Sequence, residues 1–234
     1  MDEIWYAAYG TNMTLDRFTC YLTGGSPPGA RRVTPGARDP ALPRDSRPVE
    51  MRGCVYFAWE SPTWGGGIAF YDPAGEGRSV GRAYLLTLGQ LSDVVAQEMH
   101  RTPGADLDLR DLVTDGTALL GPGRYESMHV VGQIDDAPVV TMTSSWEADE
   151  ISYNPPGAAY LATMGRGLAE GQGWDPDQVT AYLLARPGIG DVWDDDSVRA
   201  VLAPPLTGNG LRPHRSVAHD RPRVPEHPVR DERS

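Results

Sequence analysis

The first candidate for chemistry is a loop near the start of the chain, Tyr9-Gly10-Thr11-Asn12-Met13. It follows an apolar run that predicts a buried strand, and it comes directly before a predicted helix. Glycine permits a tight turn, and main-chain N–H groups near a helix N-terminus carry partial positive charge. Such a loop can hold a carboxylate or stabilise an oxyanion, although an ordinary strand-to-helix turn has the same composition.

The second candidate is Glu98, which lies in a predicted helix that starts near Leu88. Its position three and four residues after Val95 and Val94 places it at the border of the apolar stripe of that helix. Burial raises the pKa of a carboxylate and makes it a better general base near neutral pH. The alternative at this spacing is a solvated glutamate on the helix surface.

The common catalytic motifs are missing from the sequence, which has no GxGxxG, GxxxxGK[ST], GxSxG, HExxH or CxxC. His100 and His129, the histidines outside the C-terminal segment, have no partner pattern. The three aspartates that begin at Asp194 stand where a helix would start, so they predict a helix cap rather than a metal site. Cys20 and Cys54 fit packing positions. We therefore expect no metal and no cofactor.

Hydrophobic periodicity predicts an α+β fold with a mixed or closed sheet, not a regularly alternating, doubly wound one. The predicted strands span residues 4–9, 53–59, 68–71 and 80–87, followed by a hairpin of 124–134 and 138–144. The predicted helices start at Thr14 and Leu88, the second ending at Pro103-Gly104, and three more follow at about 158–170, 176–186 and 195–203. Residues 26–50 are a predicted surface excursion, and residues 105–123 are a predicted acidic, leucine-containing insertion.

The composition predicts one domain over residues 1–205 and a disordered, Arg- and Pro-rich tail over 206–234. The net charge of -11 argues against nucleic acid as a partner, because phosphate binding needs a concentrated positive face. The N-terminus does not read as a secretory leader, and no run approaches the ~18 apolar residues of a membrane span. Arg without any Lys is typical of a GC-rich genome. We expect a cytoplasmic, bacterial protein, a monomer or homodimer, with no membrane partner.

Four segments, in order, resemble the γ-glutamylcyclotransferase-like family and span residues 4 to 173. The loop at residues 9–13 is similar to the family's Tyr-Gly-Ser-Asn-Leu signature. The strand at 80–87 and the helix that ends Gln97-Glu98 are similar to a strand and helix that end in Gln-Glu-Gly in the family, where the Glu is catalytic. The later matches are Gly123-Arg124-Tyr125, which looks like a tyrosine-bearing strand, and Pro156 with Tyr160, which are similar to the start of the last helix.

The resemblance implies a barrel-like mixed sheet with peripheral helices and an intramolecular transamidation that needs no cofactor. The α-amino group of a small γ-glutamyl substrate attacks its own γ-carbonyl and gives 5-oxoproline and a free amine. Glu98 would take the proton from the α-ammonium and return one to the leaving amine. Main-chain groups of Gly10 to Met13, next to Tyr9, would hold the glutamyl moiety, and Tyr125 would hydrogen-bond it.

Several departures from the family pattern leave alternatives open. Thr11 stands in place of Ser, Met13 in place of Leu, and Met99 in place of the Gly after the glutamate. The two predicted insertions have no counterpart in compact members of the family. One alternative is a catalytically inactive protein that binds a small ligand or acts as a scaffold. Another is a different acyl or amide transfer in the same pocket.

Overall fold

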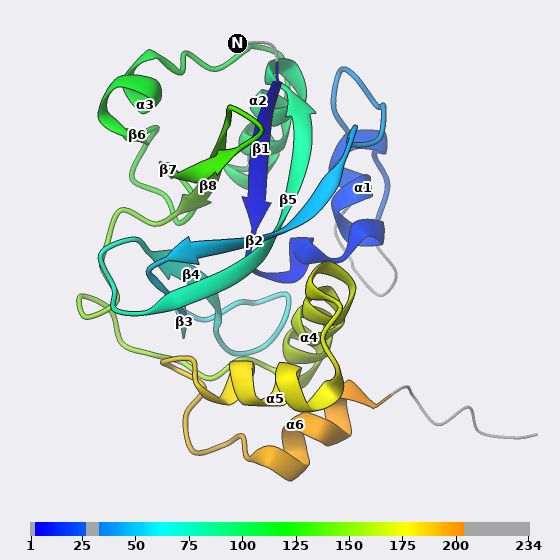
Figure 1. The fold of residues 1–234 in the computed structure, drawn as a ribbon, viewed down its shortest axis with the longest axis vertical. Coiled ribbons are helices and arrows are strands. Elements are labelled where there is room, and N and C mark those ends of the chain that lie inside the picture. Colours follow the sequence, from blue (N-terminus) through cyan, green and yellow to red (C-terminus); the bar gives the residue numbers. More distant parts are fainter. Residues whose placement is uncertain (1–2, 27–32, 204–234) are drawn as a thin grey trace, which may run out of the picture. The chain divides into compact units, whose positions relative to one another are not determined.

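The computed structural model describes residues 3–26 and 33–203, whose elements are shown in Figure 1. The strands are β1 (Glu3–Ala8), β2 (Ser46–Arg52), β3 (Cys54–Ala58), β4 (Ile68–Asp72), β5 (Arg78–Thr87), β6 (Thr117–Leu119), β7 (Ser127–Ile134) and β8 (Ala137–Thr143). The helices are the 3-10 helix η1 (Thr11–Met13) and the α-helices α1 (Leu15–Thr23), α2 (Leu88–Glu98), α3 (Arg110–Asp115), α4 (Ala158–Gln172), α5 (Pro176–Leu184) and α6 (Asp195–Leu202). The predicted tail at 206–234 lies outside the described residues.

Six strands form one mixed sheet in the order β2-β5-β1-β8-β7-β6, and β3 pairs with β4 in a second sheet. Strand β1 runs antiparallel to β5 and parallel to β8, which confirms the predicted α+β class with a mixed sheet. The predicted hairpin is formed by β7 and β8. Its turn contains Asp135 and Asp136, both at positive φ (47° and 63°), a geometry that aspartate tolerates better than most residues.

Strand β1 is held firmly because both of its faces are buried. All residues from Ile4 to Ala8 are buried, and Tyr6 stacks on Phe18 of α1 with ring centroids 5.7 Å apart. Phe18 in turn stacks on Tyr84 of β5 at 4.0 Å. Full burial of a side chain such as Phe18 stabilises the fold by about 1.5–3 kcal/mol. The strand therefore delivers the loop that follows it to a fixed place.

The end of the predicted 26–50 insertion belongs to the main sheet, so the prediction of a surface excursion was wrong there. Strand β2 pairs antiparallel with β5 from Ser46 through Arg52. It is an edge strand with mostly exposed side chains, so its sequence lacks the apolar run of a core strand. Pro48 is tolerated because a sheet edge needs no hydrogen bond on its outer side. The 105–123 segment likewise holds α3 and β6.

Helix α2 ends at Glu98, earlier than the Pro-Gly pair that was predicted to end it. The chain turns at His100, which has a left-handed φ of 58°. The amides of His100 and Arg101 donate to the carbonyls of Gln97 (3.1 Å) and Ala96 (2.7 Å). This pair of bonds is a Schellman motif, which terminates a helix by satisfying its last carbonyls. Glu98 consequently lies at the open end of the helix and not inside it.

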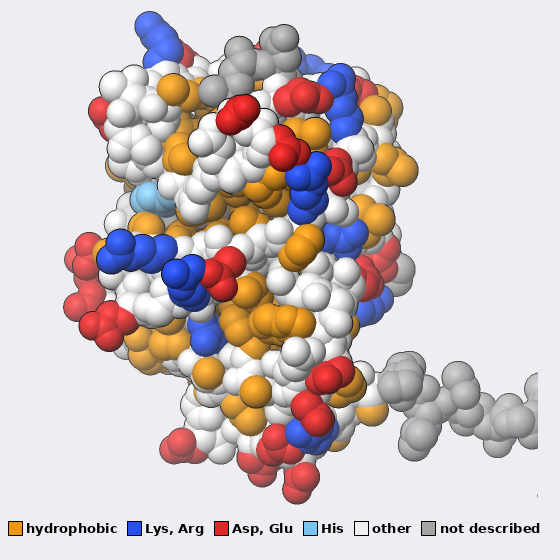
Figure 2. Space-filling view, in the orientation of Figure 1, with side chains coloured by type: hydrophobic (Ala, Val, Ile, Leu, Met, Phe, Trp, Pro, Cys, Tyr) orange, Lys and Arg blue, Asp and Glu red, His pale blue; other side chains and the backbone are white. Residues whose placement is uncertain are grey.

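Helices α4, α5 and α6 pack together, and α4 also covers η1 and β5 (Figure 1). The predicted cap at Asp194 is confirmed, because its carboxylate accepts the amide of Ser197 at 2.9 Å. Figure 2 shows acidic side chains over the α5–α6 end of this face. The exposed aspartates on these elements include Asp177, Asp195 and Asp196.

Among the described helices, none is both long enough and apolar enough to cross a bilayer.

Candidate functional site

The two segments singled out in the sequence meet at one cavity of about 480 Å³. Its walls come from the end of β1, η1, α1, the end of α2, the loop between β3 and β4, and the segment before β7. Tyr9, Gly10, Thr11, Asn12 and Glu98 all line it. Residues 86 positions apart in the chain are thus brought to the same space.

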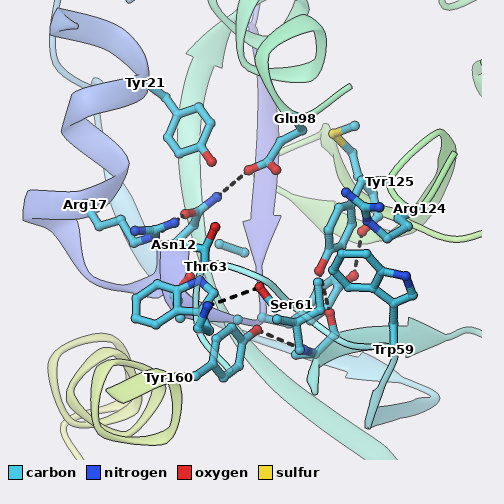
Figure 3. Close-up of a pocket in the computed structure, with 18 of the residues that line it drawn as sticks. Asn12, Arg17, Tyr21, Trp59, Ser61, Thr63, Glu98, Arg124, Tyr125 and Tyr160 are labelled. Carbon is cyan, nitrogen blue, oxygen red and sulfur yellow. Dashed lines mark hydrogen bonds between the residues drawn. The ribbon is translucent and has the colours of Figure 1, made fainter. Parts of the chain in front are cut away.

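The carboxylate of Glu98 points into the cavity and is held by the loop after β1 (Figure 3). Asn12 Nδ2 donates to Glu98 Oε1 at 2.7 Å, a short distance that suits a charged acceptor. Glu98 is half-buried, so it is neither the solvated surface residue of the alternative interpretation nor fully enclosed. Its position at the last residue of α2 explains why it reaches the cavity while Val94 and Val95 stay in the core.

Arg17 of α1 fixes the direction of the Asn12 amide. Its Nε donates to Asn12 Oδ1 at 3.2 Å, so the carbonyl end of the amide faces Arg17 and the NH2 end faces Glu98. The guanidinium also lies over the indole of Trp64, 5.1 Å from the ring centroid. Asn12 is therefore a polar bridge between a cation and the carboxylate.

Burial together with the charge of Glu98 raises the pKa of two tyrosines of the core. Burial, and secondly the negative charge of Glu98, raise the pKa of Tyr6 well above its ordinary value. The same two causes raise the pKa of Tyr21, whose ring lies next to Glu98 and Asn12 in Figure 3. Both phenols are therefore neutral at physiological pH, and their hydroxyl groups remain possible proton donors beside Glu98.

Gly10 is needed because Tyr160 approaches it closely, whereas the sequence suggested that the glycine was needed for a tight turn. Its φ is -113°, outside the left-handed region, so glycine is not required for the turn. A Cβ at this position would lie 3.0 Å from the hydroxyl oxygen of Tyr160. Gly10 thus lets Tyr160 of α4 reach the loop, and the hydroxyl lines the cavity beside it.

Tyr125 and Tyr160 bind the same peptide residue, Ala69 of β4, in opposite senses. Tyr125 donates its hydroxyl proton to the Ala69 carbonyl at 2.8 Å. Tyr160 accepts the Ala69 amide proton at 2.8 Å, so its own hydroxyl proton is not used in this bond. Burial raises the pKa of Tyr160 to about 12 and that of Tyr125 well above its ordinary value. Tyr160 is therefore a neutral donor with a proton to offer.

Met13 and Tyr125 lie in places that differ from the predicted ones. Met13 is fully buried and lies against Gly167 of α4, where an added Cβ would be 2.6 Å from Met13 Cβ, and it does not line the cavity. Its carbonyl accepts from the hydroxyl of Tyr84 at 3.0 Å. Tyr125 does line the cavity, but from the loop before β7 rather than from a strand.

The opposite wall is a loop that the sequence did not indicate as part of the site. Trp59, Ser61 and Trp64 line the cavity, and Arg124 joins them from the segment before β7. Trp59 has a φ of 61°, which is strained for a bulky residue and is found most often near functional sites. The clue in the sequence was a pair of tryptophans that flank the polar segment 60–63 just before three glycines, because a tryptophan side chain in a loop usually packs against a partner.

Among residues 3–26 and 33–203, no three His, Cys, Asp or Glu side chains are grouped so that they could hold a metal ion. The expectation of a site without metal or cofactor stays a prediction.

Comparison with known proteins gives one sequence relative. No protein-family model matches the chain. The Arabidopsis thaliana protein named histone deacetylase 5 is 31% identical over 199 residues, a match that covers 77% of this chain and 30% of that protein. The chain thus spans less than a third of the length of the curated relative that it matches.

Solved structures with a similar backbone include a gamma-glutamyl cyclotransferase, at 13% identity and a TM-score of 0.47, covering 86% of this chain and 98% of that one. An uncharacterised human protein is 13% identical with a TM-score of 0.48, covering 87% and 100% of the two chains. YkqA from Bacillus subtilis is 14% identical with a TM-score of 0.45, covering 80% of this chain and 56% of that one. All three TM-scores lie below 0.5.

Proposed function

We propose that the protein is a γ-glutamylcyclotransferase-like enzyme that converts a γ-glutamyl amide into 5-oxoproline and a free amine. The observation that carries the proposal is the Glu98 carboxylate, which faces the cavity and accepts a hydrogen bond from Asn12 of the loop after β1 (Figure 3). An internal ring closure requires one positioned acid/base group and a site that holds the two reacting ends of the substrate together.

In the proposed reaction, Glu98 accepts a proton from the α-ammonium of the substrate. The freed amine nitrogen attacks the γ-carbonyl carbon and closes a five-membered ring with an oxyanion. The carbon–nitrogen bond to the leaving amine then breaks as Glu98 returns the proton to that nitrogen. Glu98 then takes the second proton from the ring nitrogen, which gives the neutral lactam amide of 5-oxoproline, and passes it to the released amine, which departs as an ammonium. Main-chain groups of Gly10 to Asn12 hold the glutamyl part against Glu98.

Tyr160 is the proposed donor to the oxyanion. Its hydroxyl proton is not consumed by Ala69, its raised pKa keeps it neutral, and it stands beside Gly10. A fixed donor aimed at developing charge is a large contributor to catalysis of this kind. Tyr125, whose proton is donated to Ala69, can accept from the substrate, which modifies its expected role.

The decisive experiment is to incubate the protein with a panel of γ-glutamyl amides and measure 5-oxoproline. Glu98→Gln keeps an oxygen to accept from Asn12 but removes the base, so we expect kcat to fall by roughly 10²–10⁴-fold. Glu76→Gln is the matched control, because Glu76 is exposed in the β4–β5 turn and lies outside the cavity. Equal turnover by wild type and Glu98→Gln would exclude Glu98 as the base.

The same panel distinguishes the remaining alternatives. Tight binding of γ-glutamyl amides with no product in the wild type would favour the inactive ligand-binding or scaffold protein. A product other than 5-oxoproline, identified by mass spectrometry, would favour a different acyl or amide transfer. The Thr11 and Met99 departures from the family pattern are the reason for including both readouts.

A further inference from the structure

Gln97 lies directly before Glu98 in α2 and is almost completely buried, with 1% of its surface exposed. Both ends of its amide are bonded. Nε2 donates to the carbonyl of Tyr21 at 2.9 Å and to that of Asp93 at 3.0 Å, and Oε1 accepts the amide of Gly36 at 3.3 Å. Because a buried amide without partners destabilises a fold, these bonds fix the side chain in one position.

The bond from Gln97 to the Tyr21 carbonyl joins the C-terminal ends of α1 and α2. The last four carbonyls of an α-helix have no partner within that helix. Gln97 satisfies one of these carbonyls in α1, and the neighbouring carbonyl of Leu22 accepts the amide of Ala37 at 2.9 Å. The distance between the two helix ends is therefore set by Gln97 and by the segment that contains Ala37.

That segment, residues 34–41, forms a strap over both helices. Three side chains of α2 at helical spacing bind the main chain of the strap: Gln90, Asp93 and Gln97. The side chain of Asp93 is fully buried and accepts the amide of Arg38 at 2.7 Å. Gln97 stands closest to the cavity in this row and is bonded to α1 as well, so it links all three segments.

The same two helices are joined a second time at the cavity (Figure 3). Arg17 of α1 donates to Asn12, and Asn12 donates to Glu98 at the end of α2. Arg17 lies about one turn before Tyr21 in α1, and Glu98 directly follows Gln97 in α2. A change in the spacing of α1 and α2 would therefore stretch the hydrogen bonds that hold the Glu98 carboxylate.

We infer that Gln97 is a positioning residue. By joining α2 to α1 and to the strap, it keeps the Glu98 carboxylate within hydrogen-bonding distance of Asn12 and directed into the cavity. Gln97 itself does not line the cavity, so it acts through Glu98 and not by touching a substrate. The catalytic consequence rests on the proposed function, whereas the position of the carboxylate can be measured without turnover.

Gln97→Met tests the inference, because it keeps the length of the side chain and removes both polar ends. We expect kcat for the formation of 5-oxoproline to fall by about 10- to 100-fold, the order expected when a catalytic group is displaced by about 1 Å. KM should stay close to that of the wild type, because the groups that line the cavity are unchanged.

Gln90→Met is the matched control for the loss of stability. Gln90 is also buried, its Nε2 donates to the Ala41 carbonyl at 2.9 Å, and its Oε1 accepts the amide of Thr87 at 3.1 Å. It lies two helical turns before Gln97. Both variants should melt at a lower temperature than the wild type, but only Gln97→Met should lose kcat. Equal losses of kcat in the two variants would show that Gln97 has a purely structural role.

Nuclear magnetic resonance of the Asn12 side-chain amide tests the position of Glu98 without turnover. The signal is identified by its loss in Asn12→Ala. An amide proton donated to a carboxylate resonates downfield of one donated to water, so the signal should move upfield in Gln97→Met and stay in place in Gln90→Met.

The two measurements separate the inference from the proposed function. An Asn12 signal that does not move in Gln97→Met would overturn the inference, whether or not the protein makes 5-oxoproline. A signal that moves, in a protein whose wild type converts no γ-glutamyl amide, would support the positioning by Gln97 and reject the proposed reaction.

Gln97→Asn keeps the inference testable if Gln97→Met does not fold. It retains the amide but is one methylene shorter, so it cannot span the same distance between Tyr21 and Gly36. An intermediate loss of kcat and an intermediate shift of the Asn12 signal are expected. Wild-type values of both in a folded Gln97→Asn protein would contradict the inference.

Discussion

The two walls of the cavity are built in different ways. The inner wall, residues 9–12 and Glu98, stands at the ends of a buried strand and a capped helix, and its polar groups are bonded to one another. The outer wall, residues 59–64 and Arg124, consists of loop segments, and it combines a strained Trp59 with an arginine whose buried Nε has no hydrogen-bond acceptor in the described part of the chain. We infer that the inner wall performs the chemistry and the outer wall selects the substrate.

The largest expected effect is a difference in kcat between variants of Tyr160 and Tyr125, the two tyrosines that bind Ala69. Tyr160→Phe should lower kcat by roughly 10²–10³-fold, the effect of removing one oxyanion donor. Tyr125→Phe also removes a hydroxyl that binds Ala69. The proton of that hydroxyl is already donated to the Ala69 carbonyl, so a much smaller loss of kcat is expected. Steady-state kinetics and thermal melting of both variants are the measurements. Equal losses of kcat would show that both hydroxyls act only by holding β4.

A smaller effect is expected from the asparagine that holds the base. Asn12→Ala removes the bond to Glu98, and hydrogen bonds to charged groups are worth enough to lower kcat by about 10- to 100-fold. Asn154 offers a matched change behind the outer wall, because its Nδ2 donates to Glu60 at 2.7 Å and to the carbonyl of Trp59 at 2.8 Å.

Asn154→Ala should raise KM and leave kcat close to that of the wild type. The contrast between the two asparagine variants is read from full Michaelis–Menten curves. If Asn154→Ala lowered kcat as much as Asn12→Ala does, the division of labour between the walls would be wrong.

The smallest effect is expected at Trp64, which supports Arg17 and contacts the edge of Tyr160, with ring centroids 5.4 Å apart. Trp64→Leu should raise KM by about 2- to 5-fold, in line with the strength of one exposed cation–π contact. Trp174→Leu is the control, because Trp174 makes the same kind of edge contact, at 5.4 Å, with Tyr182 away from the cavity. A KM that does not change in Trp64→Leu would contradict a role for Trp64 in positioning Arg17.

The sequence predicted the inner wall better than the outer wall for a physical reason. Strand β1 and helix α2 have apolar patterns set by burial, so periodicity predicted both elements and the place of Gly10 and Asn12 directly after the strand. The end of α2 was misplaced because a histidine, not a glycine, occupies the left-handed position at residue 100. The edge strand β2 was missed because exposed strands have no apolar run.

The outer wall depends on contacts that periodicity does not encode. Arg124 and Trp59 are far apart in the chain and meet only when the β3–β4 loop folds against the segment before β7. Met13 was assigned to the site by its place in the loop, but its side chain packs under α4, and only tertiary structure distinguishes the two sides of a 3-10 helix. The sequence therefore could not predict which distant residues the loop residues contact.

The outward edge of β4 gives the site a property of its own. Where a neighbouring strand would continue the ladder, side chains take its place: Tyr125 and Tyr160 bond to Ala69, and Thr143 of β8 bonds to both the amide and the carbonyl of Tyr71. The main chain of β4 thus helps to fix the distance between the hydroxyls of the two tyrosines. Because both hydroxyls are bonded to the amide and the carbonyl of one residue, their spacing is set by the geometry of that residue as well as by the elements that carry the two rings.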